Sequence, residues 1–280
     1  IVQANGSYAI EVPLALAEGG YSVSATVADA AGNETIANDT GSVDTVAPTL
    51  TVDAPDNSND ATPTITGTSN EPDNAVVSLL VTDEAGVEQV LSATVLSGVY
   101  SVDVPDELAE GTYTVDASIT DGAGNETTAN DTGSVDTVAP TLTVDAPDNS
   151  SDATPTITGS TDAPVNSVVS ITITGSNDAV QTVNATVQAN GTYSVDVPSD
   201  LVEGSYTVQA SITDAAGNET IVSDTGNVDT VAPTLTVDAP DNSNDATPRI
   251  TGETNAPVAS TVTITVTGSN SVEQNLTAIV

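Results

Sequence analysis

Asp136-Thr-Val-Ala-Pro-Thr-Leu-Thr-Val-Asp-Ala-Pro147 is the stretch that decides the fold, because the same twelve residues occur three times in the chain. They begin at Asp44, at Asp136 and at Asp229, so the spacing is 92 and then 93 residues. A period of about 20–50 residues would indicate a solenoid, whereas a period near 92 suits one small all-β domain of about 100 residues. The chain is therefore predicted to be a row of similar domains, each beginning at an Asp-Thr-Val-Ala-Pro hinge.

This repeat divides the chain into four segments, which are residues 1–43, 44–135, 136–228 and 229–280. The middle two are predicted to be complete repeats. The first matches only the C-terminal half of a repeat, because Asn5-Gly-Ser-Tyr8 corresponds to Asn190-Gly-Thr-Tyr193, and the last matches only the N-terminal half. Half a sandwich would expose its core, so we expect the continuing polypeptide or a neighbouring copy to complete both end segments.

Alternating apolar and polar residues indicate short strands within one repeat. Pro48, Leu50 and Val52 alternate with threonines, which is the period of two of a half-buried strand. Turn-forming residues separate seven such strands, at residues 48–52, 62–68, 76–82, 87–95, 100–104, 113–120 and 127–135. This pattern predicts an all-β fold of tandem immunoglobulin-like seven-stranded β-sandwiches in an extended rod. Tyr113 begins the sixth strand, where a tyrosine corner is expected.

The charge of the chain excludes two kinds of partner. There are 40 acidic residues and one basic residue, Arg249, so the formal net charge is −39. Nucleic acid and anionic membrane surfaces both need a basic footprint, and we expect neither as a partner. No apolar run approaches the roughly 20 residues needed to span a bilayer, so membrane insertion of this segment is not expected. The 38% of hydrophobic residues alternate with polar ones, which favours folded strands over disorder.

The residue inventory also argues against an enzyme. The chain has no His, Cys or Lys, so a nucleophile would lack its usual base. Paired carboxylates could act as acid and base, but the acids recur in every repeat, mostly in loops, without an apolar cleft to raise a pKa. Trp and Phe are absent, although exposed aromatic platforms are usual in sugar-binding surfaces.

Carboxylates remain as the chemistry that this chain offers. A hard divalent cation such as Ca²⁺ takes six to eight oxygen ligands from Asp, Glu, Asn and backbone carbonyls. In a seven-stranded sandwich the hinge, the second-to-third turn and the sixth-to-seventh turn lie at one end, and the loops of the preceding domain, with Asp106 or Glu110, face them. The predicted metal ligands are therefore Asp44, Asp106, Asp121, Asn125, Asp136, Asp162, Asp214, Asn218 and Asp229. The alternative is that these acids only solvate the surface.

Three motifs resemble a known family. They are Asp-Thr-Val-Ala-Pro at the domain start, Thr-Pro-Thr-Ile-Thr-Gly on the second strand, and Asp-x-Ala-Gly-Asn, opened by Asp29, Asp121 and Asp214, before the last strand. Together they resemble the bacterial Ig-like repeats of giant secreted adhesins, including biofilm-associated proteins of the Bap type and SiiE-like adhesins. The resemblance implies an extracellular rod tethered to the bacterial cell surface, export by a type I secretion system, and Ca²⁺ at the domain junctions.

These observations predict a structural extender, or stalk, of a bacterial surface adhesin that Ca²⁺ stiffens and that supports adhesion and biofilm formation. Its expected partners are the adjacent Ig-like repeats of the same polypeptide, and neighbouring copies. Two alternatives stay open. The repeats could themselves bind a glycan or a protein, in which case one repeat should carry a unique exposed patch. They could also assemble sideways as a sheath or S-layer component.

Overall fold

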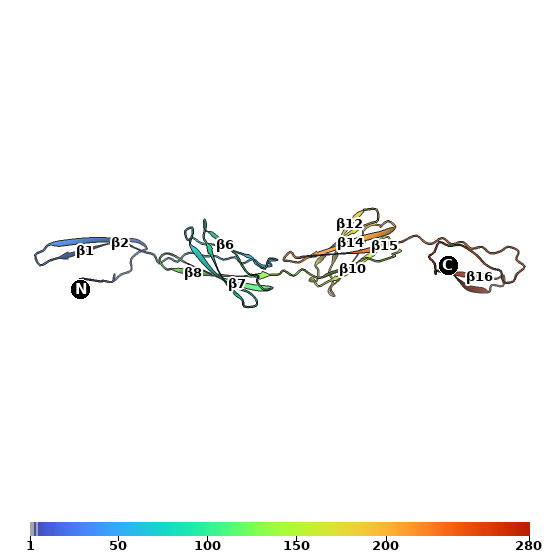
Figure 1. Ribbon diagram of the computed structural model, residues 1–280, viewed down its shortest axis with the longest axis horizontal. Coiled ribbons are helices and arrows are strands. Elements are labelled where there is room, and N and C mark those ends of the chain that lie inside the picture. The colour runs from blue at the N-terminus through green and yellow to red at the C-terminus, as the bar shows by residue number, and fades with distance from the viewer. Residues whose placement is uncertain (1–2, 4) are drawn as a thin grey trace. The chain divides into compact units, whose positions relative to one another are not determined.

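The computed structural model describes residue 3 and residues 5–280, and the elements of this part of the chain are β-strands (Figure 1). Positions 1, 2 and 4, at the start of the predicted segment 1–43, lie outside the described residues. Within the described part, no helix has the length and apolarity that crossing a membrane requires. The chain forms two compact units, residues 1–139 with 213–218, and residues 140–212 with 219–280.

The segment 44–135 folds as a sandwich of two sheets. Its named strands are β3 (Thr64–Thr68), β4 (Val76–Thr82), β5 (Glu88–Thr94), β6 (Val99–Asp103), β7 (Gly111–Thr120) and β8 (Glu126–Val135). One sheet has the order β5-β4-β7-β8, and the other pairs β3 with β6. Isolated antiparallel bridges hold the first predicted strand: Leu50 pairs with Ser69, one residue after β3, and Asp53, one residue after the predicted strand, pairs with Thr66 of β3. The other six predicted strands lie within two residues of the observed bounds, because each has one clearly apolar face.

The segment 136–228 repeats this arrangement. Its strands are β9 (Leu142–Asp145), β10 (Thr156–Thr161), β11 (Val168–Thr174), β12 (Val180–Thr186), β13 (Thr192–Asp196), β14 (Gly204–Thr213) and β15 (Glu219–Val228). One sheet has the order β13-β10-β9 and the other β12-β11-β14-β15. Three strands facing four is an immunoglobulin-like sandwich, so the predicted fold class is confirmed.

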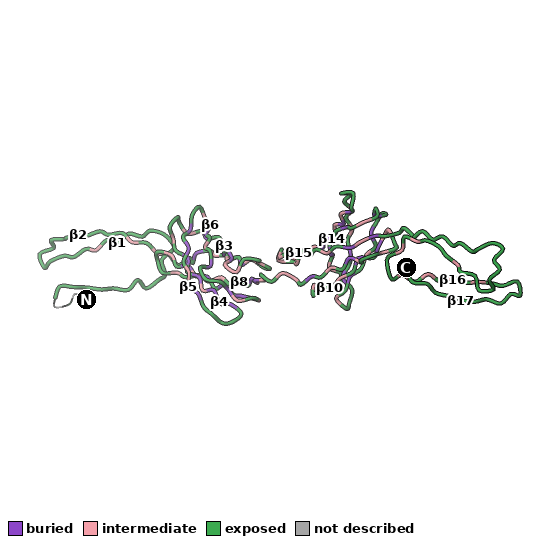
Figure 2. Tube along the Cα trace, turned by 45° about the vertical axis from the view of Figure 1, so that its right-hand side comes forward, coloured by how far each residue is buried: buried purple, intermediate pink, exposed green. Residues whose placement is uncertain are grey.

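Each of these two segments has a core of its own. In the first, Ile65 of one sheet faces Val77, Leu79 and Val81 of the other, and all four side chains are buried. The second core extends from Leu142 to Val228 and shares no residue with the first. Figure 2 shows the buried residues gathered in these two stretches of the chain. We therefore expect each repeat to be held together mainly by its own apolar burial.

In each complete repeat, one tyrosine hydroxyl binds the backbone of the first strand from within the same sheet. Tyr100 of β6 lies directly opposite Gly67 of β3, and its hydroxyl donates to the Thr51 carbonyl at 2.6 Å. Burial raises the pKa of Tyr100 to about 12. A Cβ at Gly67 would stand 2.2 Å from the Thr51 oxygen and 2.4 Å from the tyrosine ring, so only glycine fits under this ring.

A second tyrosine fastens the same strand to the four-stranded side. Tyr113 of β7 lies opposite Gly133 of β8, and its hydroxyl donates to the Pro55 carbonyl at 3.1 Å. In a tyrosine corner the hydroxyl bonds to backbone a few residues upstream. Here the acceptor lies 58 residues upstream, so the prediction of a tyrosine corner at Tyr113 is wrong. The ring instead fills the space that Gly133 leaves and closes the sandwich over a long sequence separation.

Among the described residues, each end segment contains one two-stranded hairpin, and the C-terminal segment adds two isolated antiparallel bridges, Leu235 with Thr254 and Asp238 with Thr251. At the N-terminal end β1 (Gly19–Ala28) pairs with β2 (Glu34–Val43), and at the C-terminal end β16 (Thr261–Thr267) pairs with β17 (Glu273–Ile279). Their residues are largely exposed, as Figure 2 shows. Completion of these segments by further polypeptide or by a neighbouring copy stays a prediction.

Candidate functional site

The hinge Asp136-Thr-Val-Ala-Pro140 follows β8 directly, and hydrogen bonds hold the backbone of its first residue. The Asp136 amide donates to the Ser58 carbonyl, in the loop after the first strand, at 2.9 Å. The Asp136 carboxylate accepts from the Val138 amide at 3.3 Å, so this aspartate caps the turn that follows it. The first residue of the hinge thus continues the hydrogen bonding of the sandwich that precedes it.

A glutamate from the same sandwich holds the second hinge residue. Glu110 lies in the loop between β6 and β7, and its two carboxylate oxygens accept from the Thr137 amide at 3.2 and 3.1 Å. The Thr137 hydroxyl also donates to this carboxylate. Charge-assisted hydrogen bonds of this kind are stronger than neutral ones, so Glu110 restricts the hinge directly after it leaves the sandwich.

The turn between β14 and β15 holds the hinge from the other side. Within the turn, Oδ1 of Asp214 accepts from the amides of Ala216 and Asn218, both at 2.9 Å. The Asn218 side-chain amide donates to Oδ2 of Asp214 at 3.0 Å and to the Asp136 carbonyl at 2.7 Å. We call Glu110, Asp136, Thr137, Asp214 and Asn218 the hinge clasp.

The same contacts recur at the preceding hinge. There Glu18 accepts from the Thr45 amide, and the Asn125 side chain donates to the Asp44 carbonyl at 3.2 Å. Asp121 takes the place of Asp214 and accepts three backbone amides of its own turn. The repetition shows that the hinge clasp follows from the repeated sequence itself.

The third hinge contains half of these contacts. Glu203 accepts from the Thr230 amide at 2.9 Å, and the Asp229 carboxylate accepts from the Val231 amide at 3.2 Å. The segment 229–280 contains no Asp-x-Ala-Gly-Asn turn, since that motif belongs to the other half of a repeat. Asp229 therefore lies in the same local turn as Asp136, without the asparagine contact.

The two remaining predicted ligands are held outside the hinge clasp. Asp162, in the turn between β10 and β11, accepts from the Thr141 amide at 2.8 Å and so fixes the chain one residue after Pro140. Asp106 is held through its backbone, where Gln89 accepts from its amide at 3.1 Å and donates to its carbonyl at 2.9 Å. The structure thus brings Asp136, Asp214 and Asn218 together and places Asp162 beside the hinge, while Asp106 contacts Gln89.

Hydrogen bonding keeps the turn carboxylates ionised. The Asn125 side-chain hydrogen bond, together with the backbone amides of the turn, lowers the pKa of Asp121 below its usual 3.8. Burial raises the pKa of Asp214, but the Asn218 side chain and three backbone amides outweigh it and lower the pKa overall. Both carboxylates therefore stay negatively charged at physiological pH, with part of each already committed to N–H donors.

The oxygens of the hinge clasp are of the type that hard cations such as Ca²⁺ prefer as ligands. Asp136 and Asp214 offer carboxylate oxygens, and the hinge offers the backbone carbonyl that Asn218 binds. In the described part of the chain, however, no three acidic side chains converge as a metal site. Coordination of Ca²⁺ needs six to eight oxygens, so backbone carbonyls and water would have to complete the set.

Sequence reasoning placed Glu110 at the correct end of its domain but missed its partner, Thr137. The signal lies in the spacing, because Glu18, Glu110 and Glu203 each precede the threonine that they bind by 27 residues. Gln89 was missed as well. Its side chain bonds to both polar backbone groups of Asp106, and the signal is again the repeat, because Gln181, 92 residues later, bonds in the same way to the backbone of Ser199.

The chain belongs to the family of bacterial Ig-like domains, whose model matches residues 49–137 and 142–238. The resemblance drawn from the sequence motifs is thereby confirmed. No curated protein matches the chain.

Among solved structures, the chain is similar to a tetra-tandem repeat in the extending region of a large adhesion protein, with 32% identity over 99% of this chain and 75% of that one, and a TM-score of 0.35. A Ca²⁺-stabilised adhesin with which an Antarctic bacterium binds ice is 22% identical over 99% and 85% of the two chains, with a TM-score of 0.39. A 1.5-MDa bacterial ice-binding adhesin is 25% identical over 83% and 82%, with a TM-score of 0.36.

Acid should weaken the turns that contribute to the hinge clasp. The folded-state pKa of Asp121 is lowered, so its contribution to stability is present above the unfolded value near 3.8 and is lost as the pH falls through the folded value. Relative to wild type, we expect Asp121→Asn to lose less of its melting temperature on acidification, because it has no carboxylate to protonate there.

Thermal melts from about pH 6 to about pH 2 measure this difference. Asp116→Asn is the matched control, since Asp116 is exposed on β7 and no side-chain hydrogen bond to it occurs among the described residues. Repulsion among the many other carboxylates is common to all three proteins and cancels in the comparison. Equal acid sensitivity of wild type and Asp121→Asn would show that the ionised Asp121 carboxylate does not stabilise this turn.

Proposed function

We propose that this chain is part of the stalk of a bacterial cell-surface adhesin, and that it holds a binding region away from the cell. The hinge clasp is the observation that carries the proposal. Two successive hinges are each held on one side by a glutamate of the preceding sandwich and on the other by an asparagine of the following one. A connection of this kind limits bending between domains, which is the property that a stalk needs.

The stability of such a stalk is the sum of the contributions of its separate repeats and hinges. Each repeat buries its own core, so its stability does not depend on the number of repeats beside it. At each hinge, several hydrogen bonds contribute on the order of 1 kcal/mol apiece, and Pro140 restricts the backbone of its neighbours. Such a chain can be lengthened by whole repeats without a new interface, and a stalk would gain reach in this way.

We further propose that Ca²⁺ stiffens the hinges. Asp136, Asp214 and Asn218 at one hinge, and Asp44 with the Asp121 turn at the other, would supply the first oxygens. In the first repeat, Asp106 would complete the set only if its loop turned toward the hinge. A bound cation would offset the repulsion between these carboxylates, which is large in a chain whose formal net charge is −39.

The proposed setting follows from the same role. A stalk works outside the cell, and the absence of cysteine is compatible with an extracellular domain that relies on metal instead of disulfides. We propose export by a type I secretion system and a contribution to biofilm formation. A tandem repeat from the extending region of a large adhesion protein is 32% identical to this chain, and an extending region is the kind of role that we assign.

Duplicating residues 136–228 in phase tests the stalk proposal. The longest strands of a repeat have ten residues and rise by about 33 Å, and a five-residue hinge adds at most about 17 Å. We therefore expect small-angle scattering to show a maximum dimension that grows by roughly 40 Å for each added repeat. A compact molecule would grow far less, and that result would overturn the proposal.

A second protein in the same experiment, Asn218→Ala, has a weakened hinge clasp at one hinge. In Asn218→Ala the donor to the Asp136 carbonyl is removed, while the two sandwich cores are untouched. We expect a broader distribution of end-to-end distances, with a loss of at most about 1 kcal/mol in the stability of the repeat whose Asp214 turn loses the Asn218 hydrogen bond. If the distribution of Asn218→Ala equals that of the parent, the hinge clasp does not limit bending.

A further inference from the structure

The first strand of each complete repeat runs beside the last strand and in the same direction. An isolated parallel bridge joins Ser58 to Val135, and another joins Ser150 to Val228 in the next repeat. β8 and β15 are the end strands of their four-stranded sheets, so this contact covers part of an otherwise open sheet edge. We call residues 44–58 and 136–150 the leading segments.

Backbone hydrogen bonds join the end of the leading segment to the end of β8. The Ser58 amide donates to the Ser134 carbonyl at 2.9 Å, and the Asp136 amide donates to the Ser58 carbonyl at 2.9 Å. The Ser134 amide donates to the Pro55 carbonyl at 3.2 Å. The same bonds recur in the next repeat, where they join Ser150, Asn227, Asp229 and Pro147. The connection is therefore a property of the repeat.

Side chains of β8 continue this row of bonds toward the beginning of the strand. The Thr127 hydroxyl donates to the Pro48 carbonyl at 2.6 Å, and the Asp131 carboxylate accepts from the Ala54 amide at 2.9 Å. Together with the Asn125 bond to the hinge, these contacts join residues that are 77 to 81 positions apart. Two parallel strands in register produce a nearly constant separation of this kind. The equivalent bonds of the next repeat come from Thr220 and Asp224.

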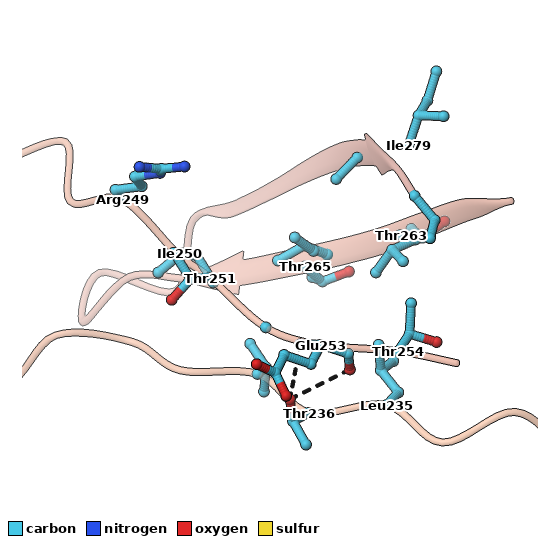
Figure 3. Close-up of a pocket in the computed structure, with 16 residues that line it drawn as sticks. Leu235, Thr236, Arg249, Ile250, Thr251, Glu253, Thr254, Thr263, Thr265 and Ile279 are labelled. Atoms are coloured by element: carbon cyan, nitrogen blue, oxygen red, sulfur yellow. Dashed lines mark hydrogen bonds between the residues drawn. The ribbon is translucent and has the colours of Figure 1, made fainter. Parts of the chain in front are cut away.

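The other side of the leading segment is bound to the second strand of the repeat. The Thr51 amide donates to the Thr68 carbonyl of β3 at 2.9 Å. The equivalent bond in the segment 229–280 runs from the Thr236 amide to the Glu253 carbonyl at 2.8 Å, and Figure 3 shows these two residues joined by hydrogen bonds. The leading segment therefore lies between the two sheets and connects them.

Tension along a stalk would enter each repeat through its two hinges. The hinge at Asp44 leads into the N-terminal end of the leading segment, and the hinge at Asp136 continues from the C-terminal end of β8. Because these two elements are parallel, pulling on the hinges moves them in opposite directions along their common axis. Hydrogen bonds between strands run across the strand direction, so they are loaded in shear and all at once. When a pair is instead peeled from one end, its bonds break one by one.

We propose that the leading segment and the last strand of each repeat form a tension-bearing pair, which keeps the sandwich closed when the chain is pulled from its hinges. The proposal rests on the proposed stalk role, which supplies the direction of the load. It gives Thr127, Asp131 and Ser134 a function different from that of the hinge clasp, because the clasp limits bending and this pair resists extension. Forced unfolding is governed by the unfolding rate, so this resistance depends on the direction of pulling, whereas the melting temperature does not.

Pulling single molecules of the 280-residue chain in two directions tests the proposal. The chain has no cysteine, so two introduced cysteines give two defined attachment points. Val46→Cys with Val138→Cys, both at exposed hinge residues, loads the pair in shear. Val46→Cys with Glu126→Cys pulls the neighbouring ends of the leading segment and β8 apart and peels the pair open. We expect pulling between the hinges to need at least about twofold higher force, because several bonds must break together.

Equal unfolding forces in the two directions, or a lower force between the hinges, would overturn the proposal. Both double variants change exposed residues outside the core of the segment 44–135, so their melting temperatures should agree with that of the wild type. A difference in force between two proteins of equal thermal stability would come from the direction of the load.

Thr127→Val tests one bond of the pair. Valine resembles threonine in shape but has no hydroxyl to donate to the Pro48 carbonyl. At constant force between the hinges we expect the variant to unfold about fivefold faster than its parent, because one hydrogen bond is lost from the set that must break. Thr128→Val is the matched control, since Thr128 is exposed on β8 and its side chain makes no hydrogen bond in the described part of the chain. If both variants unfold at the same rate, the Thr127 bond does not carry load.

Failure of this proposal and failure of the stalk proposal appear in different measurements. A compact molecule in the scattering of duplicated repeats would overturn the stalk role, and it would leave any dependence of force on direction unchanged. Equal forces in the two directions would overturn the tension-bearing pair and leave the growth in length with each repeat unchanged. The two outcomes are therefore distinguishable.

Discussion

Gly67→Ala is expected to lower the melting temperature of its own repeat by roughly 10–20 °C and to leave the next repeat unchanged. The added methyl group would stand 2.2 Å from the Thr51 oxygen and 2.4 Å from the Tyr100 ring, so the first strand or the ring must move. Overpacking of this kind costs about 1–3 kcal/mol, and 1 kcal/mol shifts the melting temperature of a domain of this size by about 4–8 °C.

Gly122→Ala is the matched control in the same repeat. No heavy atom lies within 4 Å of a Cβ built there, and neither glycine has the positive φ that side chains avoid. The equivalent positions of the other repeats already carry alanine, at Ala30 and Ala215. We expect Gly122→Ala to be neutral or to stabilise by up to about 1 kcal/mol, because alanine has less freedom in the unfolded chain.

Calorimetry of the whole chain measures both variants. Two separate cores predict two transitions, and only the transition of the segment 44–135 should move in Gly67→Ala. If Gly67→Ala and Gly122→Ala melt alike, the tyrosine does not need the glycine beneath it. If both transitions move together, the two repeats do not unfold as independent units.

The fold could be predicted because the signals that set it are local and repeated. Alternation of apolar and threonine residues is visible within each strand, and the recurrence of the twelve-residue stretch gives the domain length. The first strand was predicted from Pro48, Leu50 and Val52, and the structure holds it by bridges and by two tyrosine hydroxyls. Those hydroxyl contacts connect residues about 50 positions apart, and strand periodicity contains no information about them.

Part of the candidate site could be predicted for the same reason. Up-and-down strand order places the hinge and the Asp-x-Ala-Gly-Asn turn at one end, and the Asn218 contact with Asp136 is consistent with that topology. The sequence did not reveal which hydrogen-bond partner each polar group has. The Asp214 carboxylate caps its own turn, and Glu110 holds an amide and a hydroxyl of Thr137. Residue type indicates oxygen donors, whereas geometry decides which donors are already engaged.

Saturating Ca²⁺ is expected to raise the melting temperature of the chain by on the order of ten degrees. A ligand that binds only the folded state stabilises it by about 2.7 kcal/mol at a hundredfold excess over its dissociation constant. For a domain of about 90 residues this free energy corresponds to the shift just given. The proposed reason is that Asn218 holds the Asp214 carboxylate beside Asp136, so that a divalent cation bound there would replace repulsion between negative charges by attraction.

Asp136→Ala separates the proposed Ca²⁺-binding role of the Asp136 carboxylate from the hydrogen bonds that the rest of the hinge clasp makes. The substitution removes a carboxylate whose only side-chain hydrogen bond in the described structure comes from the Val138 amide at 3.3 Å. The backbone carbonyl that Asn218 binds is retained. We therefore expect Asp136→Ala to lose most of the Ca²⁺-dependent shift at this hinge, with little change in chelator. Asp116→Ala, an exposed acid on β7, is the control and should respond to Ca²⁺ as the wild type does.

Melting curves and small-angle scattering in millimolar Ca²⁺ and in chelator measure the effect on stability and on stiffness together. If both are the same in the two buffers, the hinges are held by hydrogen bonds alone, including those to the Glu110 and Asp214 carboxylates, and the Ca²⁺ proposal is wrong. If Ca²⁺ acts equally on wild type and Asp136→Ala, the ion binds elsewhere. Loss of the shift in Asp136→Ala, with the transition of the neighbouring repeat unaffected, would assign the ion to this hinge, because the sandwich cores on either side share no residues.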